Sequence, residues 1–97
     1  MRVGWMRVDL MIHASHSLKE KRRPLKSLLE RLGNRFNVSI AEVDYHDLHQ
    51  RTAIGIAFVA ADGDNLHGRM NAVKEFIYAN PDFQVLDIRE CDLGEGR

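Results

Sequence analysis

The sequence predicts an α+β fold in which two helices cover one face of a four-stranded antiparallel sheet. Four segments show the alternation of apolar side chains that is typical of strands, and two longer segments repeat apolar residues at helical spacing. Their order along the chain is strand, helix, strand, strand, helix, strand. Right-handed crossovers in the two strand–helix–strand units place both helices on the same face. We therefore expect residues 1–97 to form a single domain with the ferredoxin-like βαββαβ arrangement.

The first strand is expected at residues 2–13, where side chains alternate with a period of two. One face of this strand presents Gly4, Met6, Val8, Leu10 and Ile12. The opposite face presents Val3, Trp5, Arg7, Asp9 and Met11. The first set is strongly apolar, so we expect it to lie against the helices.

The first helix is expected to begin after Ser17, because Ser17 and Glu20 have the spacing of a capping box. Its apolar stripe consists of Leu18, Leu25, Leu28, Leu29 and Leu32. Gly33 and Asn34 are typical of a helix end. Pro24 lies inside this segment, where a proline costs roughly 3 kcal/mol. Either the helix kinks in the four residues before Pro24 or it begins at Pro24, and the capping box favours the kink.

The second and third strands form the central hairpin. The second is expected at residues 35–44, where the apolar parity switches after Ile40 and predicts a bulge or burial on both faces. The third is expected at residues 51–61. Its bulky face consists of Ile54, Ile56 and Phe58, and its small face of Ala53, Gly55, Ala57 and Val59.

The second helix is expected at residues 62–81, with Asp62 or Asp64 as its N-terminal cap. Its apolar stripe consists of Leu66, Met70, Val73, Phe76 and Ile77. The fourth strand is expected at residues 82–92. Residues 93–97 are expected to fray.

Two helices leave the other face of the sheet open. This face is expected to present Trp5, Ala41, Val43, Ala53, Gly55, Ala57 and Val59. Because a solvated face normally alternates with polar residues, so apolar a surface predicts a covering partner. A second copy of the chain is the simplest cover, and another protein is the alternative. Stacking of RNA bases on this face is disfavoured, because Trp5 is the only aromatic side chain expected there.

Positive charge is concentrated in one segment of a chain whose formal net charge is zero. Residues 19–35 hold seven basic and two acidic residues, a local net charge of +5, and the remainder carries −5. The candidates for contact with nucleic-acid phosphates are Lys19, Lys21, Arg22, Arg23 and Lys26. Lys21 falls near the apolar stripe, so its stem is expected to pack while its amine reaches solvent. The alternative is a solvated charged face without a partner.

Two short loops carry clustered histidines. His46 and His49 have a spacing found in zinc sites, but no cysteine lies near them, and we interpret their segment as a polar turn. The serines and histidines of residues 13–17 contain no nucleophile-elbow pattern, and Ser17 already serves as a helix cap. We therefore expect no catalytic residues, no metal and no cofactor.

The chain lacks the signs of a secreted or membrane protein. Its only cysteine is Cys91, so no intrachain disulfide can form. The longest apolar stretch, residues 53–61, is far too short to span a bilayer, and the N-terminal residues do not read as a signal peptide. We expect a cytoplasmic protein.

The runs LKEKRRPLKSLLERLGNRFNVSIAEVD and DLHQRTAIGIAFVA resemble the YlxP-like family, a small bacterial family of unknown function. The resemblance covers roughly residues 2–91 and is most specific in residues 17–26 and 36–58. It implies a ferredoxin-like fold, a cytoplasmic bacterial protein, and genes neighbouring those of a translation initiation factor and ribosome-binding factor A. It implies no catalytic residues. Pro24 departs from the pattern, because an ordinary helix former is expected there.

Three functional hypotheses follow. The first is a non-enzymatic binding protein that contacts structured RNA or the ribosome through its basic first helix. The second is a homodimeric structural or regulatory protein that uses the open sheet face. The third is an enzyme that binds a small anion or a metal, either in the first loop or beside His46 and His49.

Overall fold

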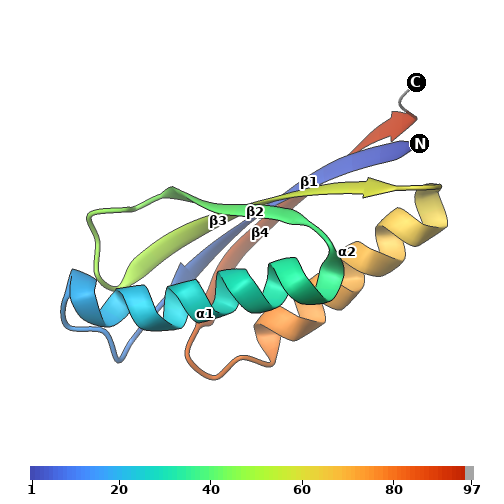
Figure 1. The fold of residues 1–97 in the computed structure, drawn as a ribbon. Coiled ribbons are helices and arrows are strands. Elements are labelled where there is room, and N and C mark those ends of the chain that lie inside the picture. Colours follow the sequence, from blue (N-terminus) through green and yellow to red (C-terminus); the bar gives the residue numbers. More distant parts are fainter. Residues whose placement is uncertain (96–97) are drawn as a thin grey trace.

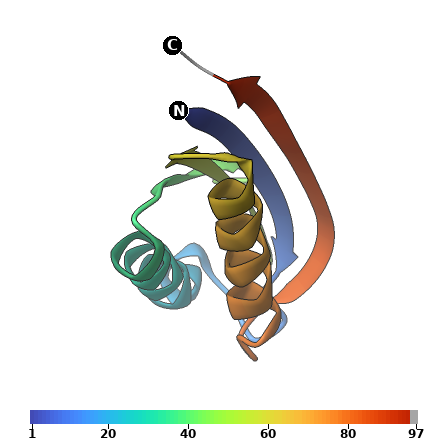
Figure 2. The same cartoon turned by 90° about the vertical axis from the view of Figure 1, so that its right-hand side faces the viewer.

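The computed structural model describes residues 1–95 of the chain. Its elements are β1 (Arg2–Met11), α1 (Leu18–Phe36), β2 (Ser39–Asp44), β3 (Arg51–Ala60), α2 (Gly63–Tyr78) and β4 (Gln84–Glu95). The strands form one antiparallel sheet in the order β2-β3-β1-β4. Both helices lie on one face of this sheet, which curves around them (Figures 1 and 2). The predicted ferredoxin-like fold is confirmed.

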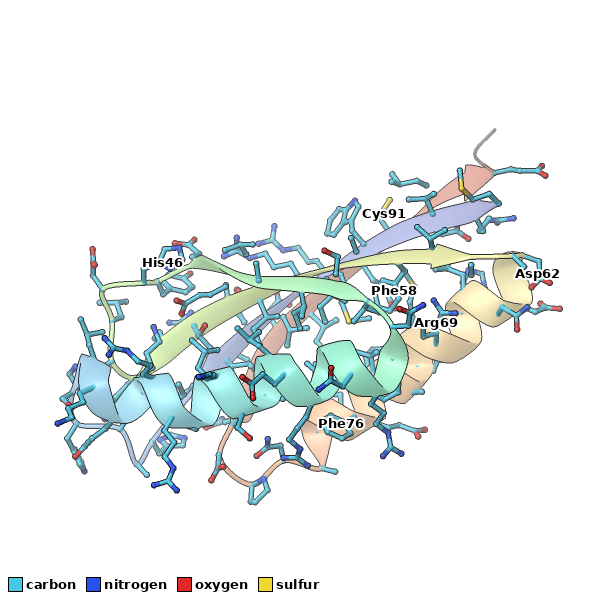
Figure 3. The ribbon with its side chains drawn as sticks, in the orientation of Figure 1. His46, Phe58, Asp62, Arg69, Phe76 and Cys91 are labelled. Carbon is cyan, nitrogen blue, oxygen red and sulfur yellow. The ribbon has the colours of Figure 1, made fainter. Side chains whose placement is uncertain are left out.

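The core lies between the sheet and the two helices. The alternation predicted for β1 is confirmed, since Met6, Val8 and Leu10 are fully buried. Phe58 of β3 is also fully buried and lies between the sheet and the helices (Figure 3). Burial of each such side chain contributes about 1.5–3 kcal/mol. Gly4 lies where α2 approaches the sheet closely, because a Cβ there would lie 2.6 Å from the Met70 side chain.

Helix α1 runs without interruption through Pro24, so the alternative in which it begins at Pro24 is wrong (Figure 1). The Ser17 hydroxyl accepts a hydrogen bond from the backbone N–H of Glu20 at 3.0 Å, as predicted. The Glu20 carboxylate accepts from the N–H of His16 at 2.6 Å, one residue before the cap. These contacts fix the first turn, and the buried leucine stripe holds the helix beyond the proline.

The end of α1 differs from the prediction. The helix passes Gly33 and Asn34 and continues to Phe36, and Asn37 ends it with a left-handed φ of 51°. Asparagine is among the few residues that adopt this conformation readily. Phe36 packs edge-on against Phe76 of α2, which explains why the helix extends by another turn. Strand β2 therefore starts only at Ser39.

Irregular pairing occurs at both edges of the sheet. The register between β2 and β3 shifts between Glu42 and Asp44, which confirms the predicted bulge. In β4 the register against β1 shifts twice, on either side of residues 87–92. Residues 93–95 continue β4, so the expected fraying is wrong for them, whereas residues 96–97 lie outside the described part of the chain.

The alternative left open for the second helix is also resolved. Asp62 is the N-cap of α2, and its carboxylate accepts from the N–H of Asn65 at 2.9 Å. Asp64 lies inside the first turn, where its negative charge faces the positive end of the helix dipole.

Candidate functional site

Lys21 does not belong to the cationic surface, contrary to the prediction. Its side chain is buried, with 3% of its area exposed. The ammonium group donates to the backbone carbonyls of Tyr45 and Leu48, both at 2.9 Å, and lies 2.9 Å from the Glu42 carboxylate. Lys21 lies on the core-facing flank of α1, and the β2–β3 loop closes over it. The residue anchors this loop to the helix.

Glu42 completes this buried network. Besides Lys21, its carboxylate accepts from the Thr52 hydroxyl at 2.6 Å and contacts Nδ1 of His46 at 2.8 Å. Burial alone would raise the pKa of Glu42, but hydrogen bonds from Lys21, Thr52 and His46 outweigh burial and hold this pKa below its usual value. The carboxylate is thus held in its ionised form, the form that the Lys21 ammonium group requires.

The two candidate metal ligands are not brought together with a third. His46 contacts Glu42, and His49 is exposed in the turn. Within residues 1–95, no three His, Cys, Asp or Glu side chains are placed to hold a metal ion together. The loop is shaped instead by Tyr45, which has a left-handed φ of 63° and stacks against Arg51. These contacts support the interpretation as a structural turn.

The first strand–helix loop is occupied by structural contacts. The Ser15 hydroxyl donates to the Ser17 carbonyl at 3.0 Å, and the His13 ring contacts the Gln84 side chain. In the described part of the chain, no serine hydroxyl is hydrogen-bonded to a histidine. A cavity of about 330 Å³ lies beside this loop. It is lined by Ile12, Ala14, Ser15, Glu20, Arg23, Pro24, Ser27 and Asp82.

The remaining basic candidates form an exposed surface on α1. We call Lys19, Arg22, Arg23 and Lys26 the cationic face; all four are exposed. The one ion pair found for them in residues 1–95 joins Lys26 to Glu30 at 4.0 Å, between two largely exposed side chains. Such a pair is worth about 0.3–0.5 kcal/mol and is easily exchanged for another anion. The cationic face is therefore available to a negatively charged partner.

The apolar half of the open sheet face is centred on Trp5. In the strand register Trp5 lies between Ala57 of β3 and Cys91 of β4. Cys91 is directed away from the helices (Figure 3). The exposed fractions are 41% for Trp5, 50% for Val43 and 58% for Val59. A shallow hollow of about 420 Å³ adjoins Trp5. Its wall on this face includes Ala41, Val43, Gly55 and Ala57.

The other half of this face is charged and internally paired. Arg7 donates to Asp9 and Asp44, both at 3.1 Å, and Arg89 lies 3.6 Å from Asp87. The Tyr45 N–H and the Arg7 guanidinium hold the pKa of Asp44 below its usual value. These ion pairs leave the Trp5 half as the apolar part of the face.

One predicted interface residue is not available. Ala53 is completely buried, because it lies in register between Asp9 and Asp44 and the ion pairs of Arg7 extend over its methyl group. Conversely, Cys91 faces the Trp5 surface but was not among the predicted interface residues. The parity of β4 could have indicated its place, but the bulges of that strand obscured the register.

The family described as "Protein of unknown function (DUF503)" matches residues 3–90. The chain is 39% identical over 82 residues to the uncharacterized protein YlxP of Bacillus subtilis (strain 168), covering 84% of this chain and 89% of that protein.

Two solved structures share the fold. The de novo designed protein Foldit4 has a TM-score of 0.54 at 14% identity, covering 94% of this chain and 97% of its own. The de novo designed ferredoxin-fold protein LFR1 1 has a TM-score of 0.52 at 11% identity, covering 98% of this chain and 88% of its own. At such identities the likeness concerns the fold alone.

Neither described helix is long and apolar enough to cross a membrane.

Proposed function

Since the chain belongs to the DUF503 family of proteins of unknown function, we propose from its geometry that it is a binding protein for structured RNA and carries out no reaction itself. The cationic face of α1 is the contact surface. The observation that carries the proposal is the exposure of four basic side chains that lack a strong acidic partner in residues 1–95. We propose a cytoplasmic setting, where such RNA is abundant.

The cationic face would recognise the phosphate backbone rather than the bases. Lysine and arginine side chains on a helix contact phosphates without reading sequence, and each contact releases a condensed counterion. Four contacts would give a slope of about −3 in a plot of log affinity against log salt concentration. The open sheet face contributes no stacking platform, because Trp5 is the only aromatic residue of β1 and β3 on that side.

The test compares two double variants of equal charge. R22Q/R23Q removes two charges from the cationic face, whereas K74Q/R89Q removes two charges from α2 and β4. By fluorescence anisotropy with an RNA hairpin at low salt, we expect R22Q/R23Q to weaken binding at least about tenfold and to flatten the salt slope by about 2. K74Q/R89Q should change neither the RNA affinity nor the salt slope by more than about twofold. Equal affinities for R22Q/R23Q and the wild type would refute the proposal.

A second candidate function, self-association through the open sheet face, is favoured by the Trp5 surface. An isologous dimer needs a protruding group and a matching hollow on the same patch, and here Trp5 adjoins a hollow lined by small side chains. In this proposal, each Trp5 enters the hollow of the second copy. The paired charges of Arg7 and Arg89 border the contact on one side as a polar rim.

Sedimentation equilibrium at micromolar concentration tests the dimer. Replacing Ala57 by Glu introduces a charge into the centre of the contact, and we expect only monomer. The matched control, Ala61 to Glu, changes an exposed alanine in the turn before α2 and should remain dimeric. A wild type that stays monomeric up to about 100 µM, where a specific interface would have assembled, excludes this candidate.

A further inference from the structure

The groove between α1 and α2 holds a second positively charged cluster, distinct from the cationic face. Arg31 and Arg35 of α1 both lie over the ring of Phe76 of α2, with guanidinium carbons 4.9 Å and 5.5 Å from its centroid. Phe76 lies between the two helices on the side away from the sheet (Figure 3). At 100° per residue, this pair is about 150° around α1 from the cationic face. The two clusters are therefore separate surfaces.

The aromatic ring is itself held in place. Phe36 contacts Phe76 edge-on, with centroids 5.6 Å apart and an angle of 79° between the planes. Arg35 also lies 5.6 Å from the Phe36 ring. Exposed arginine side chains normally lose much rotamer freedom on binding a ligand. Here stacking restricts Arg31 and Arg35 before any ligand arrives, so the two guanidinium groups are preorganised.

Neither guanidinium group is neutralised within residues 1–95. No carboxylate lies within ion-pairing distance of Arg31 or Arg35 there. The hollow beside them has a volume of about 370 Å³ and is lined by Arg31, Asn34, Arg35 and Phe76. Two planar groups of N–H donors and the Asn34 amide line one open hollow, and neither guanidinium group has a carboxylate partner in residues 1–95.

We propose that Arg31, Arg35 and Asn34 form a binding site for a phosphate group. Inorganic phosphate and phosphate monoesters carry close to two negative charges and a backbone phosphodiester carries one, and in each case the oxygens accept the paired N–H bonds that arginine presents. The phosphate comes either from an RNA backbone or from a small phosphorylated molecule. Only the RNA form rests on the proposed function; the site itself does not depend on it.

The first experiment titrates the full chain with inorganic phosphate and follows the arginine Nε–H and Asn34 amide signals by NMR. We expect saturable binding with one site, perturbing Arg31 and Arg35. R31Q/R35Q should weaken it at least about tenfold, as expected for the loss of charge-assisted hydrogen bonds. R31K/R35K keeps the charge but loses the planar donors, and F76L loses the stacking ring; each should weaken binding several-fold.

K74Q/R89Q is the matched control, because it removes two positive charges from α2 and β4, outside both the cationic face and the Arg31/Arg35 cluster. Phosphate affinity unchanged by K74Q/R89Q supports the site, whereas an equal loss in both double variants means diffuse attraction and overturns it. The proposal is also overturned if R31Q/R35Q lowers thermal stability while phosphate binding never saturates, because the arginines then only shield Phe76.

Titration with an RNA hairpin distinguishes the two sources of phosphate. If R31Q/R35Q weakens RNA as strongly as inorganic phosphate, the group belongs to the RNA backbone. If it abolishes phosphate binding and leaves RNA affinity unchanged, the ligand is a small phosphorylated molecule. The proposed function fails by a separate result, namely if R22Q/R23Q leaves the RNA affinity unchanged.

Discussion

Replacing Lys21 by Met should destabilise the protein strongly, although the substitution keeps an unbranched side chain only one atom shorter. The change leaves the carboxylate of Glu42, whose side chain is 15% exposed, without its cation. It also leaves two loop carbonyls, of Tyr45 and Leu48, without a donor. Removing one partner of a buried ion pair costs 3–5 kcal/mol, and we expect about 3 because Thr52 and His46 still donate to Glu42.

Urea denaturation followed by circular dichroism measures this loss. A loss of about 3 kcal/mol corresponds to a fall in Tm of about 15 °C for a domain of this size. Lys19 to Met is the control, because it removes the same charge from the exposed side of the same helix and should change stability by less than about 0.5 kcal/mol. A loss below about 1 kcal/mol for Lys21 to Met would refute the assignment of a buried anchor.

The pH dependence provides an independent test of the same network. The folded pKa of Glu42 is lowered, so its contribution to stability is complete above the pKa of the unfolded carboxyl group. The contribution disappears as pH falls through the lower folded value. The difference in stability between the wild type and the Lys21 variant should therefore narrow on acidification. A difference that stays constant from pH 7 to pH 3 would contradict this account.

Two further predictions concern the end of the sheet that carries both termini. Asp92 accepts hydrogen bonds from the guanidinium of Arg2, the N–H of Gly94 and the His67 ring, and these contacts lower the pKa of Asp92 far below its usual value. Asp92 to Asn should therefore speed amide hydrogen exchange in β1 and β4. Acid below the usual titration range of aspartate should speed this exchange in the wild type as well. Gly4 to Ala should cost about 1–3 kcal/mol in chemical denaturation, because the new methyl group meets Met70 at 2.6 Å and the Cys91 carbonyl at 2.9 Å. Met70 to Ala in the same chain should not restore stability, because it opens a cavity in the core and the Cys91 carbonyl still meets the new methyl group.

The sequence predicted the fold well because periodicity is a local signal. Strand β1 alternates without error, and the cap at Ser17 is recognisable from two residues. The end of α1 was wrong because its cause is tertiary, namely the contact of Phe36 with Phe76 of the other helix. The left-handed cap at Asn37 lies beyond Gly33, the residue that local sequence rules favour as the helix end.

The candidate sites were predicted less accurately, because they depend on partners distant in sequence. The position of Lys21 in the leucine stripe was visible, but the two carbonyls that receive its amine belong to a loop more than twenty residues away. Ala53 of β3 is covered by the ion pairs of Arg7, which join β1 to β2 across it. In the sequence, Arg31 and Arg35 contributed only to the local net charge, because the sequence of α1 does not indicate that a ring of α2 lies beneath them.

The displaced register of β4 has a consequence for behaviour in a crowded cell. An outer strand with free backbone groups invites the addition of a foreign strand and runaway fibre growth. In β4 only residues 87–92 pair with β1 in an unbroken register, and the chain deviates on both sides of them. An incoming strand could therefore form regular backbone hydrogen bonds with six residues of β4 at most, because the register changes on both sides of them. We expect this interruption to limit strand addition at the uncovered edge of β4.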